Sequence, residues 1–269
     1  MLSLTDNPGP RAEPGLRGRI ALVTGSTGGI GLAVARALAR AGCDIRLHGL
    51  ASAAEAAPAL AELEALGIRA SYHRAELADP TAIAALIAEA GPPDILVNNA
   101  AARHFGPVEE TTPEAWDEDI AVNLSAAFHL VRLSLPVMRR RGWGRVLNMS
   151  SIYGLIGAAN RVGYVTTKTA LIGLTRAVAL ETATSGITCN ALCPGSTLTP
   201  NIEARLRAAM AAGGLDRGAA EAQFLAGKQP TGRFVQAEAI GAMAAFLCSE
   251  AGRDITGAVL PLDGGWSAA

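Results

Sequence analysis

The sequence predicts an α/β protein built as one doubly wound parallel sheet of about seven strands, with helices on both faces. Short apolar runs alternate with longer Ala- and Leu-rich segments in which apolar residues recur at helical spacing. Several short runs, such as residues 20–23 and 95–97, are apolar throughout, which is typical of parallel strands covered on both faces. With 269 residues, half of them hydrophobic, the chain can bury one large core.

The order of these segments defines the expected elements. Strands are expected at residues 20–24, 44–48, 68–73, 94–98, 144–149, 186–192 and 257–262. Helices are expected near residues 30–42, 53–66, 80–90, 113–141, 163–184, 202–226 and 237–249, and Pro80 and Pro113 suit the first turns of two of them. Residues 1–18, with three prolines and three glycines, are expected to form a flexible tail, and residues 19–269 the single domain.

The composition excludes several classes of function. A formal net charge of -1 and a pI near 6.4 indicate no basic surface for nucleic acid or an anionic membrane. No uninterrupted apolar run reaches the roughly 18 residues of a membrane-spanning helix. Cys189 and Cys193 lie four apart but flank an apolar stretch, so we interpret them as small buried hydrophobic residues. The sequence therefore predicts a soluble cytoplasmic protein with reduced thiols and no metal, nucleic-acid partner or membrane.

A glycine-rich loop at residues 24–31, Thr-Gly-Ser-Thr-Gly-Gly-Ile-Gly, follows the first expected strand and opens the first expected helix. The missing side chains let the backbone turn sharply and approach a pyrophosphate, whose negative charge is attracted by the N–H groups and dipole at the helix start. A glycine-rich turn alone is as often only a tight turn. Its position between a strand and a helix predicts a dinucleotide site.

Tyr164 and Lys168 are spaced i and i+4 on an expected helix, so their side chains lie on one face, one turn apart. A phenol with a pKa near 10 is a poor base at neutral pH, and a nearby ammonium would stabilise the phenolate. Ser151 ends the fifth expected strand, at the sheet edge where open α/β sheets bind ligands. In isolation this spacing would indicate only an amphipathic helix, but the loop and Ser151 favour a proton-transfer site.

Together these motifs resemble the short-chain dehydrogenase/reductase family from about Arg19 to the C-terminus. The glycines follow the spacing Gly-x-x-x-Gly-x-Gly, Asn98-Asn99-Ala100 ends the fourth strand, and Ser151 precedes Tyr164 by thirteen residues. The resemblance implies a Rossmann-type domain that moves a hydride between a nicotinamide and a CH–OH carbon without a metal. It implies a catalytic set in which Tyr164 exchanges the proton, Ser151 holds the oxygen, Lys168 lowers the pKa of the tyrosine, and Asn123 supports a water chain to solvent.

The resemblance also implies which residues bind the dinucleotide. They are Gly25, Thr27, Gly28, Gly29, Ile30, Gly31, Leu50, Glu76, Leu77, Asn99, Tyr164, Lys168, Pro194, Gly195, Thr197 and Thr199. The acidic residue that usually binds the ribose hydroxyls is absent, since the sequence reads His48-Gly49-Leu50-Ala51 there. Because Gly28 and Leu50-Ala51 stand where NADP-preferring relatives usually carry a cation, a 2′-phosphate would be poorly held. NAD is therefore predicted, with NADP as the alternative.

Within the family, the sequence is most similar to bacterial D-3-hydroxybutyrate dehydrogenases, in residues 123–129, 179–183, 228–230, 234–235 and 263–266. This similarity implies a small hydroxy acid or keto acid as substrate, such as D-3-hydroxybutyrate and acetoacetate. The implied substrate residues are Arg103, His104, Tyr153, Arg161, Ser196, Arg205 and Trp266. Only His104 and Trp266 match that group; Gln, His, Lys, Trp and Gln are common at the other five positions. The extra arginines and the small Ser196 leave a longer or more acidic hydroxy acid open.

Two further functions stay open on the sequence alone. An NADPH-dependent ketoreductase of the 3-oxoacyl type would share the same motifs. A dinucleotide-sensing protein without turnover would share the fold but should have lost part of the set Ser151, Tyr164 and Lys168, which is complete here. The resemblance also implies a homotetramer.

Overall fold

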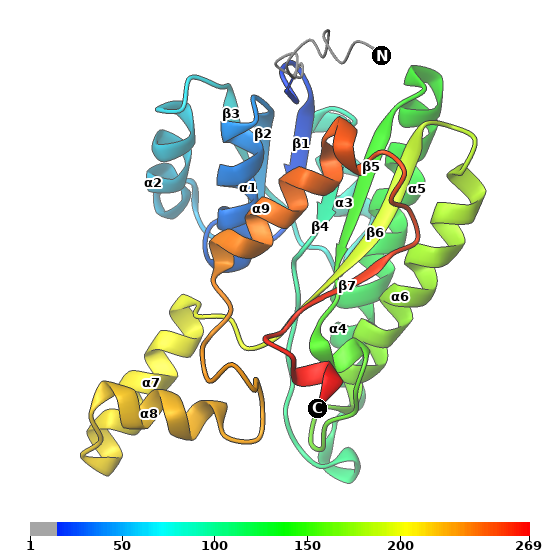
Figure 1. The fold of residues 1–269 in the computed structure, drawn as a ribbon. Coiled ribbons are helices and arrows are strands. Elements are labelled where there is room, and N and C mark those ends of the chain that lie inside the picture. The colour runs from blue at the N-terminus through cyan, green and yellow to red at the C-terminus, as the bar shows by residue number, and fades with distance from the viewer. Residues whose placement is uncertain (1–14) are drawn as a thin grey trace, which may run out of the picture.

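The structure, a computed structural model, describes residues 15–269 and contains one seven-stranded parallel sheet (Figure 1). The strands are β1 (Ile20–Val23), β2 (Asp44–Gly49), β3 (Ala70–Arg74), β4 (Ile95–Asn98), β5 (Gly144–Met149), β6 (Ile187–Pro194) and β7 (Val259–Leu262). Their order is β3-β2-β1-β4-β5-β6-β7, so the chain reverses direction across the sheet between β1 and β4. The predicted doubly wound fold is confirmed. Most of the expected tail, residues 1–14, lies outside the described residues, whereas Leu16 is buried against the core.

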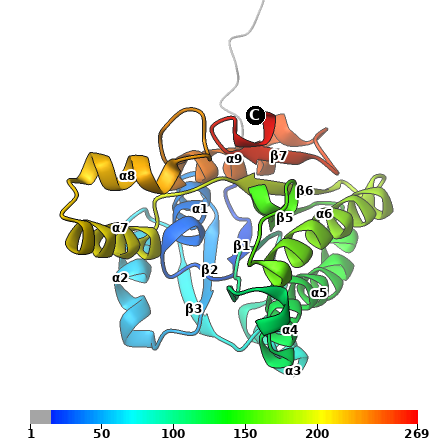
Figure 2. The same ribbon diagram turned by 90° about the horizontal axis from the view of Figure 1, so that it is seen from below.

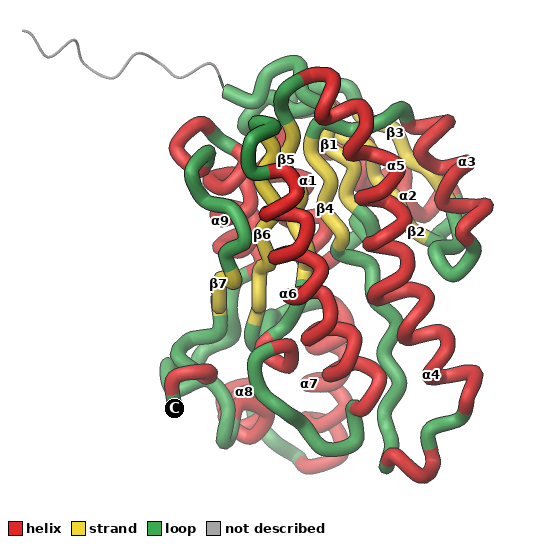
Figure 3. Tube along the Cα trace, turned by 90° about the vertical axis from the view of Figure 1, so that its right-hand side faces the viewer, coloured by secondary structure: helices red, strands yellow, loops and turns green. Residues whose placement is uncertain are grey.

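Helices cover both faces of the sheet, as the side view in Figure 3 shows. They are α1 (Gly29–Arg40), α2 (Ala53–Glu64), α3 (Pro80–Ala90), α4 (Pro113–Ile120), α5 (Ala126–Arg141), α6 (Val162–Thr182), α7 (Pro200–Gly213), α8 (Arg217–Leu225) and α9 (Ala237–Cys248). Neighbouring residues of β1 point into different cores: Val23 packs with Leu38 and Leu247, and Leu22 with Ile83. The continuous apolar runs of the sequence therefore reflect strands that are buried on both sides.

The prediction of one helix over residues 202–226 is wrong. The chain forms two helices there, α7 and α8, because Gly214 adopts a left-handed conformation (φ 60°) and ends α7. The Asp216 side chain then accepts a hydrogen bond from the Ala219 N–H and caps α8. The two helices enclose a small core of their own, formed by Leu206, Ala220, Leu225 and Phe234. In Figure 1 this helical pair projects beyond the carboxyl ends of the strands, and Figure 2 shows it at one side of the molecule.

The expected helix at residues 113–141 is continuous but not uniform. α4 and α5 are joined by a π-helical segment, Ala121–Ser125, with Asn123 at its centre. The whole helix has an 18-residue window with a mean hydropathy of 1.4, so by length and composition alone it could cross a membrane. This is weak evidence, because core helices satisfy the same criteria, and Leu130, Val131 and Met138 pack into the core beneath the sheet.

Candidate active site

A cavity of about 550 Å³ lies at the carboxyl ends of β1 and β4, where the strand order reverses. Open α/β sheets bind ligands at this point, because the loops on either side diverge. The predicted dinucleotide residues that line the cavity are Gly25, Thr27, Gly28, Gly29, Ile30, Gly31, Leu50, Glu76, Leu77, Asn99 and Thr199. The other five predicted dinucleotide residues do not line it: Tyr164 and Lys168 lie on α6, Pro194 and Gly195 lie at the end of β6, and Thr197 is buried in a bridge to Val235.

The glycine loop needs its glycines for space and for backbone conformation. Gly25 and Gly29 have φ angles of 60° and 55°, which favour glycine. A Cβ at Gly31 would lie 2.3 Å from the Gly25 carbonyl oxygen, so no side chain fits there. A Cβ at Gly28 would meet nothing within 4 Å, and α1 begins directly after it without a side-chain cap. The open N–H groups at this helix start fit a pyrophosphate.

Two polar side chains hold the glycine loop against the end of β4. The Thr24 hydroxyl oxygen accepts hydrogen bonds from the N–H groups of Asn99 (2.9 Å) and Ala100 (3.0 Å). The Asn99 side-chain amide donates to the carbonyls of Thr24 and Gly25, both at 2.9 Å. Asn99 therefore stabilises the loop itself, in addition to lining the cavity.

A cation that the sequence prediction missed lies beside Leu50, one of the residues that line the cavity. The Arg74 Nε donates to the Leu50 carbonyl at 2.9 Å, so its exposed guanidinium lies beside the residue that follows β2. His48 is buried beneath them, where its Nδ1 accepts from the Gly25 N–H and its Nε2 lies 3.0 Å from the Ala75 carbonyl oxygen. Burial lowers the pKa of His48, so this side chain supports the loop as a neutral ring.

The fifth strand and the helix α6 bring Ser151, Tyr164 and Lys168 together. The Ser151 hydroxyl accepts from the Tyr153 N–H at 3.2 Å, and it is one of the groups that lower the pKa of the Tyr164 side chain. The Lys168 ammonium lies 5.5 Å from the centre of the Tyr164 ring and donates to the Met149 carbonyl at 2.8 Å. All three side chains are buried, and the lysine is only 2% exposed.

The charges around Tyr164 oppose the effect of burial on the pKa of its phenol. Burial by itself raises the pKa of the phenol, but the positive charges of Lys168 and Arg103 and a hydrogen bond from Ser151 outweigh it, so the net pKa of Tyr164 is lowered. Burial also lowers the pKa of Lys168, and the charge of Tyr164 opposes that shift. The arrangement favours a phenolate paired with an ammonium.

Asn123 lies next to this group without touching the reacting end of Tyr164. Its amide donates to the Ala102 carbonyl (3.1 Å) and to the Thr167 hydroxyl (3.2 Å), and its oxygen accepts from the Ala102 N–H (2.8 Å). These bonds tie the π-helical segment to α6 and to the loop after β4. The role of Asn123 in a water chain stays a prediction.

Aromatic and cationic side chains surround Tyr164 on its open side. The Tyr153 ring lies 6.5 Å from the Tyr164 ring and 5.5 Å from the Trp266 ring. The Arg103 guanidinium lies 5.2 Å from the Tyr164 ring, and that of Arg161 lies 5.1 Å from the Tyr153 ring. These four predicted substrate residues thus form one group.

The other three predicted substrate residues contact residues outside this group. Arg205 on α7 contacts the Phe224 ring at 5.0 Å. The Ser196 N–H donates to the Gln229 side chain at 2.6 Å. His104 lies 3.2 Å from the buried Asp119 carboxylate and 3.4 Å from Glu118, so its ring is held by acidic residues.

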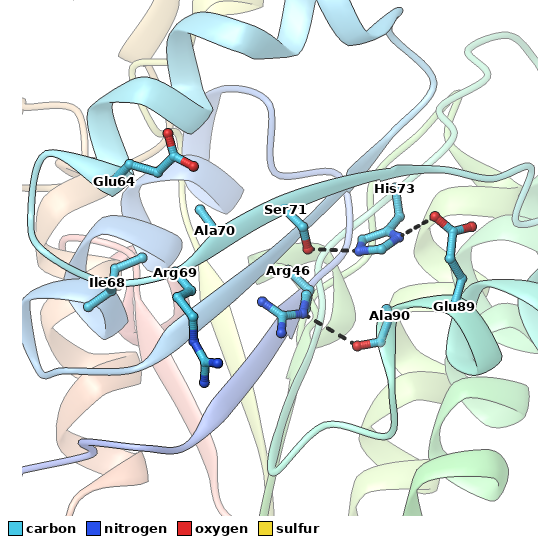
Figure 4. Close-up of a pocket in the computed structure, with 9 residues that line it drawn as sticks. All are labelled: Arg46, Glu64, Ile68, Arg69, Ala70, Ser71, His73, Glu89 and Ala90. Atoms are coloured by element: carbon cyan, nitrogen blue, oxygen red, sulfur yellow. Dashed lines mark hydrogen bonds and ion pairs between the residues drawn. The ribbon is translucent and has the colours of Figure 1, made fainter.

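A second hollow lies beside the edge strand β3 (Figure 4). Its polar groups bond to one another: the Ser71 hydroxyl lies 2.8 Å from His73 Nε2, and His73 Nδ1 lies 3.0 Å from a Glu89 oxygen. None of the predicted site residues lines it. Within residues 15–269, no group of three or more His, Cys, Asp or Glu side chains is placed to hold a metal ion.

With this geometry established, comparison with known proteins identifies the family. The sequence matches the short chain dehydrogenase family over residues 19–209. The chain belongs to this family. Two relatives are D-beta-hydroxybutyrate dehydrogenases: that of Cupriavidus necator is 43% identical over 94% of this chain and 99% of its own length, and that of Rhizobium meliloti is 38% identical over 93% and 99%.

Solved structures of the short-chain dehydrogenase fold agree. A 3-oxoacyl (acyl-carrier-protein) reductase from Agrobacterium tumefaciens with NADP bound has a TM-score of 0.86 and 34% identity, covering 94% of this chain and 96% of its own. An L-sorbose reductase from Gluconobacter frateurii complexed with NADPH and L-sorbose has a TM-score of 0.90 and 29% identity, covering 96% and 99%. The chain is therefore a short-chain oxidoreductase of CH–OH groups, and its relatives support a hydroxy-acid dehydrogenase.

The bonds of Thr24 yield a stability prediction. Thr24→Val keeps the shape of the side chain but leaves the N–H groups of Asn99 and Ala100 without their acceptor, so we expect the free energy of unfolding to fall by about 1–3 kcal/mol. Thr24→Ser keeps the hydroxyl and is the matched control. Urea unfolding of the two variants measures the difference, and equal stability would contradict the role of the hydroxyl.

Proposed function

We propose that the protein is an NAD-dependent dehydrogenase that reversibly oxidises the secondary alcohol of a 3-hydroxy acid, of the same kind as D-3-hydroxybutyrate. The single observation that carries the proposal is the buried group of Ser151, Tyr164 and Lys168, which contacts Arg103 at the edge of the glycine-loop cavity. A nicotinamide, when bound, accepts or supplies the hydride. The same buried group speaks against a sensor without turnover, since such a protein has no use for an activated phenol.

The protein side chains handle the proton and the oxygen. In the oxidation direction the Tyr164 phenolate takes the proton of the substrate hydroxyl, and the Ser151 hydroxyl donates a hydrogen bond to the same oxygen. Lys168 keeps its positive charge close to Tyr164 in both protonation states. Asn123 holds the adjoining π-helical segment, and we assign it to the path that returns the proton to solvent. In the reduction direction, the same residues act in reverse order.

A carboxylate substrate is supported by the cations on the open side of Tyr164. Arg103 contacts the ring of Tyr164, where the acid group of a short hydroxy acid would lie once its hydroxyl meets Tyr164, and Arg161 lies one ring further out, beside Tyr153. Trp266 closes this side of the group against Tyr153. The names of the two relatives agree with this substrate class.

The choice of cofactor is less one-sided than the sequence prediction assumed. NAD was expected because no cation stands at Gly28 or directly after β2, but Arg74 from β3 reaches the Leu50 carbonyl. Two solved relatives contain NADP or NADPH. We propose that NAD is the main cofactor and that Arg74 allows NADP to bind by pairing with its 2′-phosphate. NADPH-dependent ketone reduction of the 3-oxoacyl type is the second candidate function that this observation favours.

We also propose a cytoplasmic homotetramer that needs no nucleic acid or membrane. Large apolar side chains are exposed on three helices, namely Phe128 on α5, Leu180 on α6 and Phe246 on α9. Contacts between subunits would cover them. Analytical ultracentrifugation tests the assembly, and a monomer at micromolar concentration would refute it.

Replacing the proposed base should remove turnover without removing binding. For Tyr164→Phe we expect the rate of alcohol oxidation to fall by about 10²–10⁴-fold, the usual contribution of a general base. Dinucleotide affinity, measured by the quenching of tryptophan fluorescence, should change little, since the cavity of the glycine loop is intact. A variant that retained full activity would refute the assignment.

The charge of Arg103 predicts a shift in the pH profile. The phenolate is the active form in oxidation, so kcat/KM should rise with pH through the pKa of Tyr164, which Arg103 helps to lower. Arg103→Gln removes that charge, raises the pKa of Tyr164 and should move the inflection to higher pH, whereas Arg103→Lys should keep most of the effect. A lost substrate contact alone would change KM and leave the inflection where it was.

Arg74 should discriminate between the two dinucleotides. Arg74→Ala should lower kcat/KM for NADP by about tenfold or more, the loss of one charge-assisted hydrogen bond, and change the value for NAD by less than about twofold. Steady-state rates with both cofactors measure this. Equal losses with NAD and NADP would show that Arg74 has no contact with the 2′-phosphate.

A further inference from the structure

Three cations gather on the substrate side of the site, further from the reacting group than Arg103. Arg161 precedes α6 and lies between the rings of Phe105 (4.5 Å) and Tyr153 (5.1 Å). Arg205 on α7 and Lys228 after α8 both contact the Phe224 ring, at 5.0 Å and 3.9 Å. We call Arg161, Arg205 and Lys228 the distal cation cluster.

The distal cation cluster carries positive charge that the protein does not neutralise. Within residues 15–269, none of its three members forms an ion pair with a carboxylate, whereas Arg207 and Arg217 of the same helical pair both bond to Glu203. The Lys228 ammonium donates only to the Phe224 carbonyl, at 2.5 Å. Burial and the charges of Arg205 and Arg161 lower the pKa of Lys228, so the three cations repel one another.

A single carboxylate does not match this charge. One guanidinium binds one carboxylate through two parallel hydrogen bonds, which would leave the other two cations of the cluster unpaired. Arg103 adds a fourth cation beside Tyr164.

We propose that the substrate is a secondary alcohol with at least two negative charges, and that its second anionic group binds to the distal cation cluster. This inference rests on the proposed dehydrogenase function. A 3-hydroxy dicarboxylic acid and a hydroxy acid with a terminal phosphate share this chemistry. Because Arg161 directly precedes α6, whereas Arg205 lies on α7 and Lys228 follows α8, the anion would join these two parts of the chain.

The decisive experiment compares substrates that differ in one charge. 3-Hydroxyglutarate and 3-hydroxypentanoate both have five carbons, and the first is prochiral, so only the second must be supplied as both enantiomers. We expect kcat/KM to be at least about tenfold higher for the diacid, the value of one additional charge-assisted contact. A third arm, 3-hydroxy-4-phosphooxybutanoate, tells whether a phosphate is preferred over the second carboxylate.

Variants connect the preference to the cluster. In the double variant Arg205→Gln, Lys228→Gln, the ratio of kcat/KM for diacid over monoacid should fall to about one, while Arg207→Gln, an exposed and ion-paired position on α7, should leave it unchanged. The KM of the diacid should also rise more steeply with salt than that of the monoacid.

Each other outcome overturns a defined statement. A monoacid that is oxidised as well as or better than the diacid refutes the dianionic substrate but leaves the dehydrogenase intact. A preference that survives the double variant refutes the assignment to the cluster. If no alcohol of a broad panel is oxidised with NAD or NADP, the proposed function fails and this inference fails with it.

Discussion

The site depends on one buried charge. Lys168 is almost inaccessible to solvent, and placing an ammonium in such surroundings costs several kcal/mol unless neighbouring groups compensate. The Met149 carbonyl at the end of β5 accepts a hydrogen bond from the ammonium. Tyr164, one turn earlier on α6, balances the positive charge when it is a phenolate. The strand and the helix must therefore keep their relative position, since moving either would leave the ammonium unpaired. The positive charge of Lys168 in turn lowers the pKa of the tyrosine.

The positively charged side chains become less buried from the reacting group outward, but they do not become fewer. Lys168 is enclosed, Arg103 reaches Tyr164 from the exposed loop after β4, and the distal cation cluster lies beyond Tyr153. Acidic residues of the neighbourhood are engaged elsewhere, with Glu118 and Asp119 around His104 and Glu203 between two arginines. The field in the open part of the site is therefore positive although the whole chain has a net charge of -1. Such a field attracts and orients anionic substrates.

The helical pair of α7 and α8 carries part of the proposed substrate site. Its small core is separate from the two cores that cover the sheet, so its position can change with limited disturbance to the domain. Arg205 lies on α7 and Lys228 follows α8, whereas Ser151 follows β5 and Tyr164 and Lys168 lie on α6. Proton transfer and the proposed substrate selection thus rest on different parts of the chain.

The sequence by itself determined the order of strands and helices, because hydrophobic periodicity and the continuous apolar runs are local signals. It also determined the glycine loop and the group of Ser151, Tyr164 and Lys168, since each depends on spacing next to one strand end or on one helix face. Hydrophobic periodicity did not reveal that residues 202–226 form two helices. Gly213-Gly214 followed by Asp216 was the signal in the sequence that indicated the break. Only tertiary structure decided the neighbours of residues distant in the chain. Arg74 reaches Leu50 because β2 and β3 are paired, and Lys228 meets Arg205 because α7 and α8 fold onto one core, relations that no local pattern encodes.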